Sequence, residues 1–167
     1  MTSVSPKIKP VVALEVDNAN VSKRSWLSRL KLDHFRNYQQ ADLAIHSGQL
    51  VILGDNGAGK TNLLEAVSLL APGRGMRRAK IEHLAYRASG FDTSCDIADN
   101  DDADRLDWAV AATLENEDGN LQIGTGVPPL AKQGNRIMRL EGMTVSQADL
   151  GIHLTVSWLT PQMDGIF

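Results

Sequence analysis

The sequence predicts an α/β fold, and two patterns support that prediction. Residues 50–53 form a short apolar run typical of a buried strand, residues 54–61 are rich in glycine, and residues 62–70 place apolar side chains at helical spacing. Upstream, residues 26–35 and 43–45 alternate between apolar and polar side chains on either side of a short turn. Strands joined by short turns usually pair antiparallel. We therefore expect an antiparallel layer beside a strand–loop–helix unit.

The glycine-rich loop fits a phosphate-binding pattern without deviation. Residues 54–61 read G-D-N-G-A-G-K-T, which matches G-x-x-x-x-G-K-S/T. Glycine lets the chain curl with several N–H groups pointing inward, and these form a nest for anionic oxygens beside the N-terminus of the following helix. Lys60 is expected to reach the β- and γ-phosphates, and the Thr61 hydroxyl to ligate Mg²⁺. The predicted nucleoside triphosphate site comprises Gly54, Asp55, Asn56, Gly57, Ala58, Gly59, Lys60, Thr61 and Asn62.

The remaining residues are predicted to form short elements. Trp26, Leu30 and Leu32 share one face of the first strand, and the helix after the loop should end at residues 71–73, where proline and glycine stop it. Further strands are predicted at residues 107–114, 121–123, 135–140 and 153–159, with turns at 117–120 and 141–142, a loop at 124–134 and one helical turn at 146–150.

Composition limits the class of protein. The chain has 167 residues, 43% hydrophobic side chains and a formal net charge of −3, which suits a domain with a core and gives no global basic signature of nucleic-acid binding. Its single cysteine, Cys95, excludes an internal disulfide. The sequence has no apolar run long enough for a membrane span and no signal peptide, so we expect a cytoplasmic protein. Residues 1–25 show no sustained period and are predicted to form a flexible extension.

The densest basic cluster follows the predicted helix. Its side chains are suited to contacts with DNA phosphates. One of the arginines is suited to reach the nucleotide phosphates instead. The alternative is an ordinary solvated loop. The cluster consists of Arg74, Arg77, Arg78 and Lys80.

Three segments, taken together, resemble one family. Residues 30–38 read L-K-L-D-H-F-R-N-Y, residues 54–66 extend the phosphate loop with N-L-L-E-A, and residues 72–79 read P-G-R-G-M-R-R-A. In this order they resemble the RecF family of recombination mediators, which are relatives of the SMC-type ATPases. Residues 158–164 resemble the segment at which the ATPase core of that family resumes.

The resemblance implies a P-loop NTPase fold of the ABC-ATPase type, in which an antiparallel β lobe joins a RecA-like core. It implies binding of ATP and Mg²⁺, and ATP-dependent homodimerisation on single- and double-stranded DNA at gaps. It also implies cooperation with the RecR and RecO proteins in loading RecA, with links to replication and the SOS response.

The resemblance also assigns residues. It places Arg36 and Asn37 near the nucleotide, the alternative being a turn in which Asn37 bonds its own backbone. It places Gln162 where ABC-type ATPases sense the metal ion, the alternative being a plain polar residue after a Thr-Pro turn. It supports a DNA contact for the basic cluster of residues 74–80.

Two motifs that such an ATPase needs for hydrolysis are not found. The sequence has no apolar strand that ends in Asp followed by a catalytic Glu, and no S-G-G signature. In the family both lie beyond residue 167. We therefore expect residues 26–167 to be the N-terminal portion of a head whose C-terminal part is missing, without hydrolysis of its own.

Other classes of protein use the same loop. The main alternative is the nucleotide-binding subunit of an ABC transporter, whose loops usually read G-K-S-T, whereas this one reads G-K-T-N. A small P-loop kinase would need an arginine lid and an acidic base that cannot be placed. A non-enzymatic DNA-binding fragment is the remaining alternative.

Overall fold

A six-stranded sheet forms the centre of the computed structural model, which describes residues 25–46, 49–86, 107–117, 119–129, 135–154 and 156. The strand order is β2-β1-β3-β4-β5-β6, and every neighbouring pair of strands is antiparallel. The predicted antiparallel layer is thus confirmed. The strands are β1 (Trp26–Phe35), β2 (Tyr38–Ala44), β3 (Trp108–Asn116), β4 (Gly119–Val127), β5 (Ile137–Leu140) and β6 (Met143–Val145).

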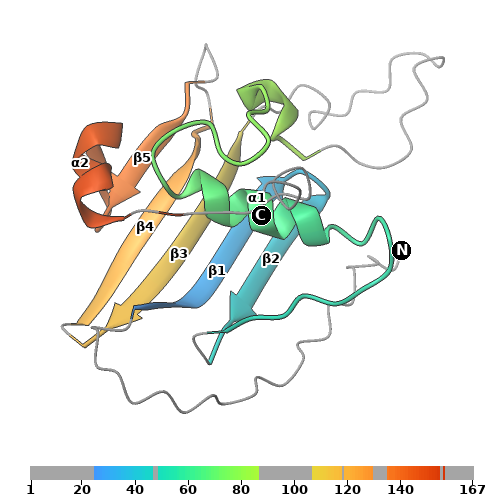
Figure 1. The fold of residues 1–167 in the computed structure, drawn as a ribbon. Helices are drawn as coiled ribbons and strands as arrows, with labels where there is room; N and C mark the ends of the chain where they lie inside the picture. Colours follow the sequence, from blue (N-terminus) through green and yellow to red (C-terminus); the bar gives the residue numbers. More distant parts are fainter. Residues whose placement is uncertain are drawn as a thin grey trace, which may run out of the picture.

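The helix after the glycine-rich loop lies across one face of this sheet (Figure 1). This is α1 (Lys60–Leu69), which ends just before residues 71–73, as predicted. The 3₁₀ helix η1 (Ile81–His83) follows it, and α2 (Gln147–His153) begins at a capping box formed by Ser146 and Asp149. None of the helices in the described ranges has the length and the apolar side chains that a membrane span requires.

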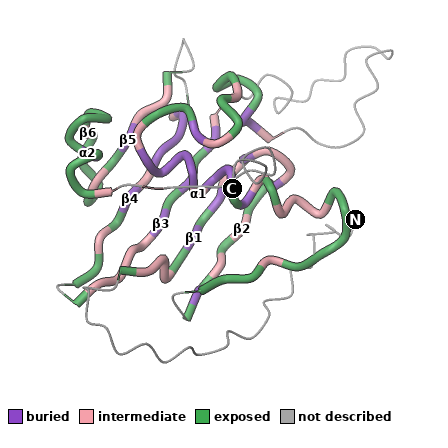
Figure 2. The backbone as a smooth tube through the Cα atoms, viewed as in Figure 1, coloured by how far each residue is buried: buried purple, intermediate pink, exposed green. Residues whose placement is uncertain are grey.

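The core fills the space between α1 and the sheet. Figure 2 shows that the buried residues concentrate on α1 and on the strand segments beside it. The Phe35 and Trp108 rings meet edge to face, with centroids 5.5 Å apart. Each large apolar side chain buried here contributes about 1.5–3 kcal/mol, so α1 has a fixed place on the sheet. The cluster includes Leu30, Leu32, Phe35, Leu63, Ala66, Leu69, Trp108, Val110 and Ala112.

The apolar run at residues 50–53 is not the buried strand that the sequence predicts. Leu50, Val51 and Leu53 are 45%, 59% and 54% exposed, and only Ile52 has bridging backbone. An apolar run is buried only where neighbouring elements cover it. Within the described residues no strand pairs along the length of this run.

The predicted loop at residues 124–134 is wrong in its first part, because β4 continues to Val127. Glycine is typical of loops, but Gly126 lies within a strand and allows close strand packing. A Cβ at Gly126 would lie 2.2 Å from the Trp108 carbonyl oxygen. The glycine therefore lets β3 and β4 approach each other closely.

Smaller corrections have local causes. The register of β1 shifts between Leu27 and Arg29, and this irregularity turns Leu27, rather than Trp26, toward the core. The strand β6 was not predicted. His153 ends α2 instead of beginning a strand. The rest of that predicted strand, like the predicted extension at residues 1–25, falls largely outside the described residues.

Candidate functional site

The glycine-rich loop leads directly into α1. Gly57 and Gly59 have φ values of 85° and 96°, which residues with a Cβ rarely adopt. Ala58 N donates to Asp55 O at 3.1 Å and closes a turn. Residues 54–57 are exposed. The loop therefore stands open at the positive end of the helix dipole.

The N-terminus of α1 has no side-chain cap. Its N-cap is Gly59, and the amides of Asn62 and Leu63 donate to Gly59 O at 2.8 and 3.1 Å. The amides of Lys60 and Thr61 come before them in the first turn and have no partner within the helix. A helix terminus of this kind is suited to binding a phosphate group.

Lys60 and Thr61 add side-chain groups to these backbone donors. Lys60 Nζ donates to the carbonyl oxygens of Gly54 and Asp55 at 2.7 and 2.8 Å, so the ammonium lies over the start of the loop. Thr61 is exposed in the first helical turn. An ammonium, a hydroxyl and free amides within one turn fit the phosphates and metal ion of a nucleotide. The individual contacts with a nucleotide stay predictions.

The β1–β2 turn packs against this loop. Asn37 Oδ1 accepts a hydrogen bond from Asn62 Nδ2 at 2.8 Å. A Cβ on Gly59 would lie 2.5 Å from Asn37 Nδ2 and 2.6 Å from Tyr38 Oη, so only glycine fits there. The Tyr38 hydroxyl is buried, with no hydrogen-bond partner among the described residues, and burial raises the pKa of this phenol. Tyr38 therefore packs behind the glycine-rich loop. The sequence alone does not indicate this role for Tyr38.

Arg36 points to a buried carboxylate on α1 rather than to the loop. Its Nε and Nη2 donate to the two oxygens of Glu65 at 2.9 and 2.8 Å, and Nη1 donates to His83 O at 2.7 Å. The side chains of Arg36 and Glu65 are 19% and 2% exposed. Since a buried charge is costly unless paired, this contact ties the β1–β2 turn to α1. A contact between Arg36 and a nucleotide stays a prediction.

Sequence reasoning gave Glu65 no role. The available signal was a carboxylate placed among apolar residues on the buried face of a helix, between Leu63 and Leu69. Such a position demands a cationic partner. The identity of that partner was not visible, because Arg36 lies 29 residues away.

The side chains of the basic cluster at residues 74–80 differ in the contacts they make with the described residues. Arg77 Nη1 donates to Asn62 Oδ1 at 3.1 Å and to Glu65 Oε2 at 3.5 Å. Lys80 Nζ lies 3.7 Å from Glu82 Oε1. Arg74 and Arg78 are exposed.

The structure does not place the predicted metal ligand Gln162, which lies outside the described residues. Across the described ranges, no three His, Cys, Asp or Glu side chains gather into a metal site. Thr61 is thus the predicted metal-binding residue that the structure locates, in the exposed first turn of α1.

Comparisons with known proteins show the family of the chain and its fold. The family model of the RecF/RecN/SMC N terminal domain matches residues 26–163. The DNA replication and repair protein RecF of Rhizobium johnstonii is 46% identical over 144 residues, which cover 84% of this chain and 34% of that protein. The protein of the same name from Allorhizobium ampelinum is 40% identical over 150 residues, 88% of this chain and 36% of the relative. The chain thus spans about a third of the length of these curated relatives.

A solved structure of the recombination mediator protein RecF-ATP in the RecFOR pathway has a similar fold. The TM-score is 0.67 at 24% identity, over 87% of this chain and 35% of that one. At this identity the likeness concerns the fold, and it confirms the predicted class: the N-terminal part of an ABC-ATPase-like head. The chain therefore belongs to the family of the RecF/RecN/SMC N-terminal domain, and the relatives named above are RecF-type DNA replication and repair proteins.

Proposed function

We propose that this chain supplies the phosphate-binding part of an ATP site in a RecF-type DNA replication and repair protein. The observation that carries the proposal is the open, glycine-capped N-terminus of α1, with Lys60 lying over the loop. Free amides, a helix dipole and an ammonium all favour an anion at the same point. The similar fold of the solved RecF-ATP structure supports ATP as that ligand.

Individual residues have distinct proposed roles. Lys60 binds the β- and γ-phosphates, and the backbone of residues 54–61 surrounds them. Thr61 holds Mg²⁺, with Gln162 as a further metal-sensing residue. Asn37 lines the site from the β1–β2 turn, because its amide lies against Gly59. Arg36 supports the same turn through Glu65.

At the level of the whole protein, we propose an ATP-dependent homodimer that binds single- and double-stranded DNA at gaps. It would act with RecR and RecO to load RecA during replication, repair and the SOS response, in the cytoplasm. The names of the curated relatives support a role in DNA replication and repair. Because this sequence contains neither the second acidic motif nor the signature motif, we propose that hydrolysis needs groups from outside these 167 residues.

The test is ATP binding and turnover by this chain, with and without gapped DNA. Replacing Lys60 with Ala should weaken ATP binding by about 10- to 100-fold, because a charge-assisted contact is lost. Lys31→Ala is the control, since Lys31 lies on β1 beside Asp42 and outside the loop. We expect ATP binding without turnover by the wild-type chain. Equal ATP affinity in the Lys60→Ala variant and the wild type would rule out the proposed site.

A further inference from the structure

The segment after α1 is packed against the helix. Gly75 is buried, and a Cβ there would lie 2.8 Å from Leu69 Cδ2. Met76 N donates to Ser68 Oγ at 2.9 Å, and Ser68 Oγ in turn donates to Glu65 O at 2.7 Å. These contacts fix the middle of the segment on the end of α1.

The start of the segment is fastened to two further elements. Gly73 N donates to Gln147 Oε1 of α2 at 3.1 Å. Gly73 O accepts a hydrogen bond from Arg136 Nη1, and Arg136 precedes β5. The segment is therefore held by side chains from three directions and is an ordered support for the arginines it carries.

The three arginines of this support differ in their surroundings. All three are exposed, but Arg77, whose side chain is 43% exposed, bonds to Asn62 and Glu65 of α1. Arg74 and Arg78 are exposed, and among the described residues neither forms an ion pair. Arg78 has a φ of 51°, a conformation that is uncommon for a residue with a side chain and that is found more often at functional sites.

A second cation lies beside Arg74. A hollow of about 240 Å³ is lined by Arg74 and Arg136 together with Ile81, Asn135 and Gln147, among others, and none of its described lining residues is a carboxylate. The guanidinium of Arg136 donates to carbonyl oxygens and to the Thr125 hydroxyl, and within the described part of the chain no carboxylate pairs with it. The surface around Arg74 therefore favours an anion.

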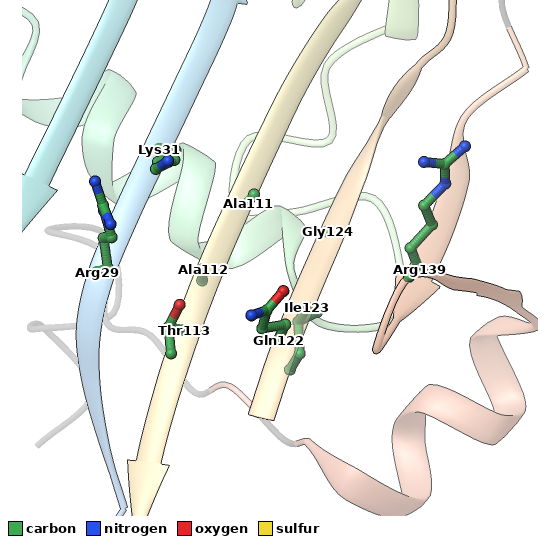
Figure 3. A pocket seen from close by; sticks show the side chains of 10 residues that line it. Arg29, Lys31, Ala111, Ala112, Thr113, Gln122, Ile123, Gly124 and Arg139 are labelled. Atoms are coloured by element: carbon green, nitrogen blue, oxygen red, sulfur yellow. The ribbon is translucent and has the colours of Figure 1, made fainter. Parts of the chain in front are cut away.

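The opposite face of the sheet also carries cations, and two of them lie beside a carboxylate. Figure 3 shows Arg29, Lys31 and Arg139 around a hollow on the strands, with α1 on the far side of the sheet. Arg29 makes a bidentate contact with Asp42 at 2.8 and 2.7 Å, and Lys31 lies 3.8 Å from the same carboxylate. This face gives a matched reference for the charge of Arg74 and Arg78.

We propose that Arg74 and Arg78 bind backbone phosphates of DNA, whereas Arg77 is a positioning residue that anchors their loop to α1. The inference rests on the proposed role in DNA binding and assigns different tasks to side chains that the sequence presents as one cluster. Phosphate contacts of exposed guanidinium groups release counterions and leave a signature in the salt dependence of binding. An arginine paired within the protein leaves no such signature.

The experiment measures binding of the purified protein to a fluorescent 20-base-pair duplex over a series of salt concentrations. The double variant R74Q/R78Q should reduce the slope of log K against log salt by about 1.8, because each phosphate contact contributes about 0.9. Near 0.1 M salt the affinity should fall on the order of tenfold or more. The variant R74K/R78K keeps both charges and should keep the slope.

Two further variants decide between the assignments. R77Q should leave the slope unchanged and lower the thermal unfolding midpoint. R29Q/R139Q removes the same charge from the opposite face and should leave the slope unchanged. The proposal is overturned if R77Q or R29Q/R139Q lowers the slope as much as R74Q/R78Q does. It is also overturned if the wild-type protein binds ATP but not the duplex, an outcome that leaves the proposed ATP site intact.

Discussion

The N-terminus of α1 is capped by a bare glycine, whereas its C-terminal end is held by the guanidinium of Arg136. At the first end the amides of Lys60 and Thr61 precede any helical hydrogen bond. At the second end Arg136 donates to the carbonyl oxygens of Leu69 and Ala71. Since both ends of a helix have unpaired groups, the contrast indicates that protein contacts satisfy one end and leave the other open to a ligand.

The N-terminus of α1 keeps its position because a side-chain contact close to it holds the helix in place. Glu65, in the second turn of α1, binds Arg36 from the β1–β2 turn. The opposite end gains from a cation placed near the negative end of the helix dipole. Burial partly desolvates the Arg136 guanidinium and lowers its pKa. Hydrogen bonds to carbonyl oxygens offset that cost.

The largest expected effect comes from breaking the anchor behind the open end. Arg36→Met leaves Glu65 buried without its bidentate partner, and Arg77 at 3.5 Å is a weak replacement. Removing one partner of a buried pair typically costs about 3–5 kcal/mol of unfolding free energy. Urea denaturation measures this loss.

The control is an exposed pair of the same chemistry. Arg29→Met breaks the bidentate contact with Asp42, whose side chains are 52% and 48% exposed, and we expect little change in stability because solvent screens exposed pairs. Equal losses in the two variants would show that burial of Glu65 is not what makes the Arg36 contact important.

A smaller effect is expected at the closed end. Arg136→Met removes the donors to Leu69 O at the end of α1 and to the Ala71 and Gly73 carbonyl oxygens just beyond it, and the unfolding free energy should fall by about 2 kcal/mol. Hydrogen exchange should show faster opening of the last turn of α1. Arg139→Met, on the exposed face of β5, is the comparison and should leave exchange in α1 unchanged. If both variants behave alike, Arg136 does not cap the helix.

The sequence predicts the open end of α1 well and the closed end poorly. The phosphate loop is a local signal, because its glycines, Lys60 and the following helix lie within one short stretch of the sequence. The pattern alone therefore predicts how these residues are arranged. Arg136 caps carbonyl oxygens up to 67 residues earlier in the chain. Nothing in the composition around residue 136 marks it as a helix cap, because the contact exists only once β4 and β5 are in place.

The same distinction explains the errors in the fold. Alternation correctly predicts that Leu30 and Leu32 share the buried face of β1, because a period of two is a property of the strand itself. The apolar run at residues 50–53 indicates a need for a covering neighbour but does not identify one. The irregularity near Ser28, which replaces Trp26 by Leu27 in the core, depends on pairing with β3. These features are set by partners distant in sequence.

The smallest expected effect concerns Tyr38, which packs behind the glycine-rich loop at the N-terminus of α1. Tyr38→Phe removes a buried hydroxyl that has no hydrogen-bond partner among the described residues. At neutral pH the unfolding free energy should rise or stay within about 1 kcal/mol of the wild-type value, because an unsatisfied buried group is removed while the ring still packs.

The alkaline range gives the sharper readout for Tyr38. Burial raises the pKa of the Tyr38 phenol in the folded protein. Below the ordinary phenol pKa of about 10 the hydroxyl is protonated in both the folded and the unfolded chain, so the unfolding free energy has its full value. Above that pH the unfolded chain loses the proton first, and the stability falls until the pH passes the raised folded pKa. Urea denaturation at a series of pH values above 9 should show a shallower decline in Tyr38→Phe than in the wild type. The same decline in both proteins would mean that a group other than the Tyr38 phenol causes the loss of stability at alkaline pH.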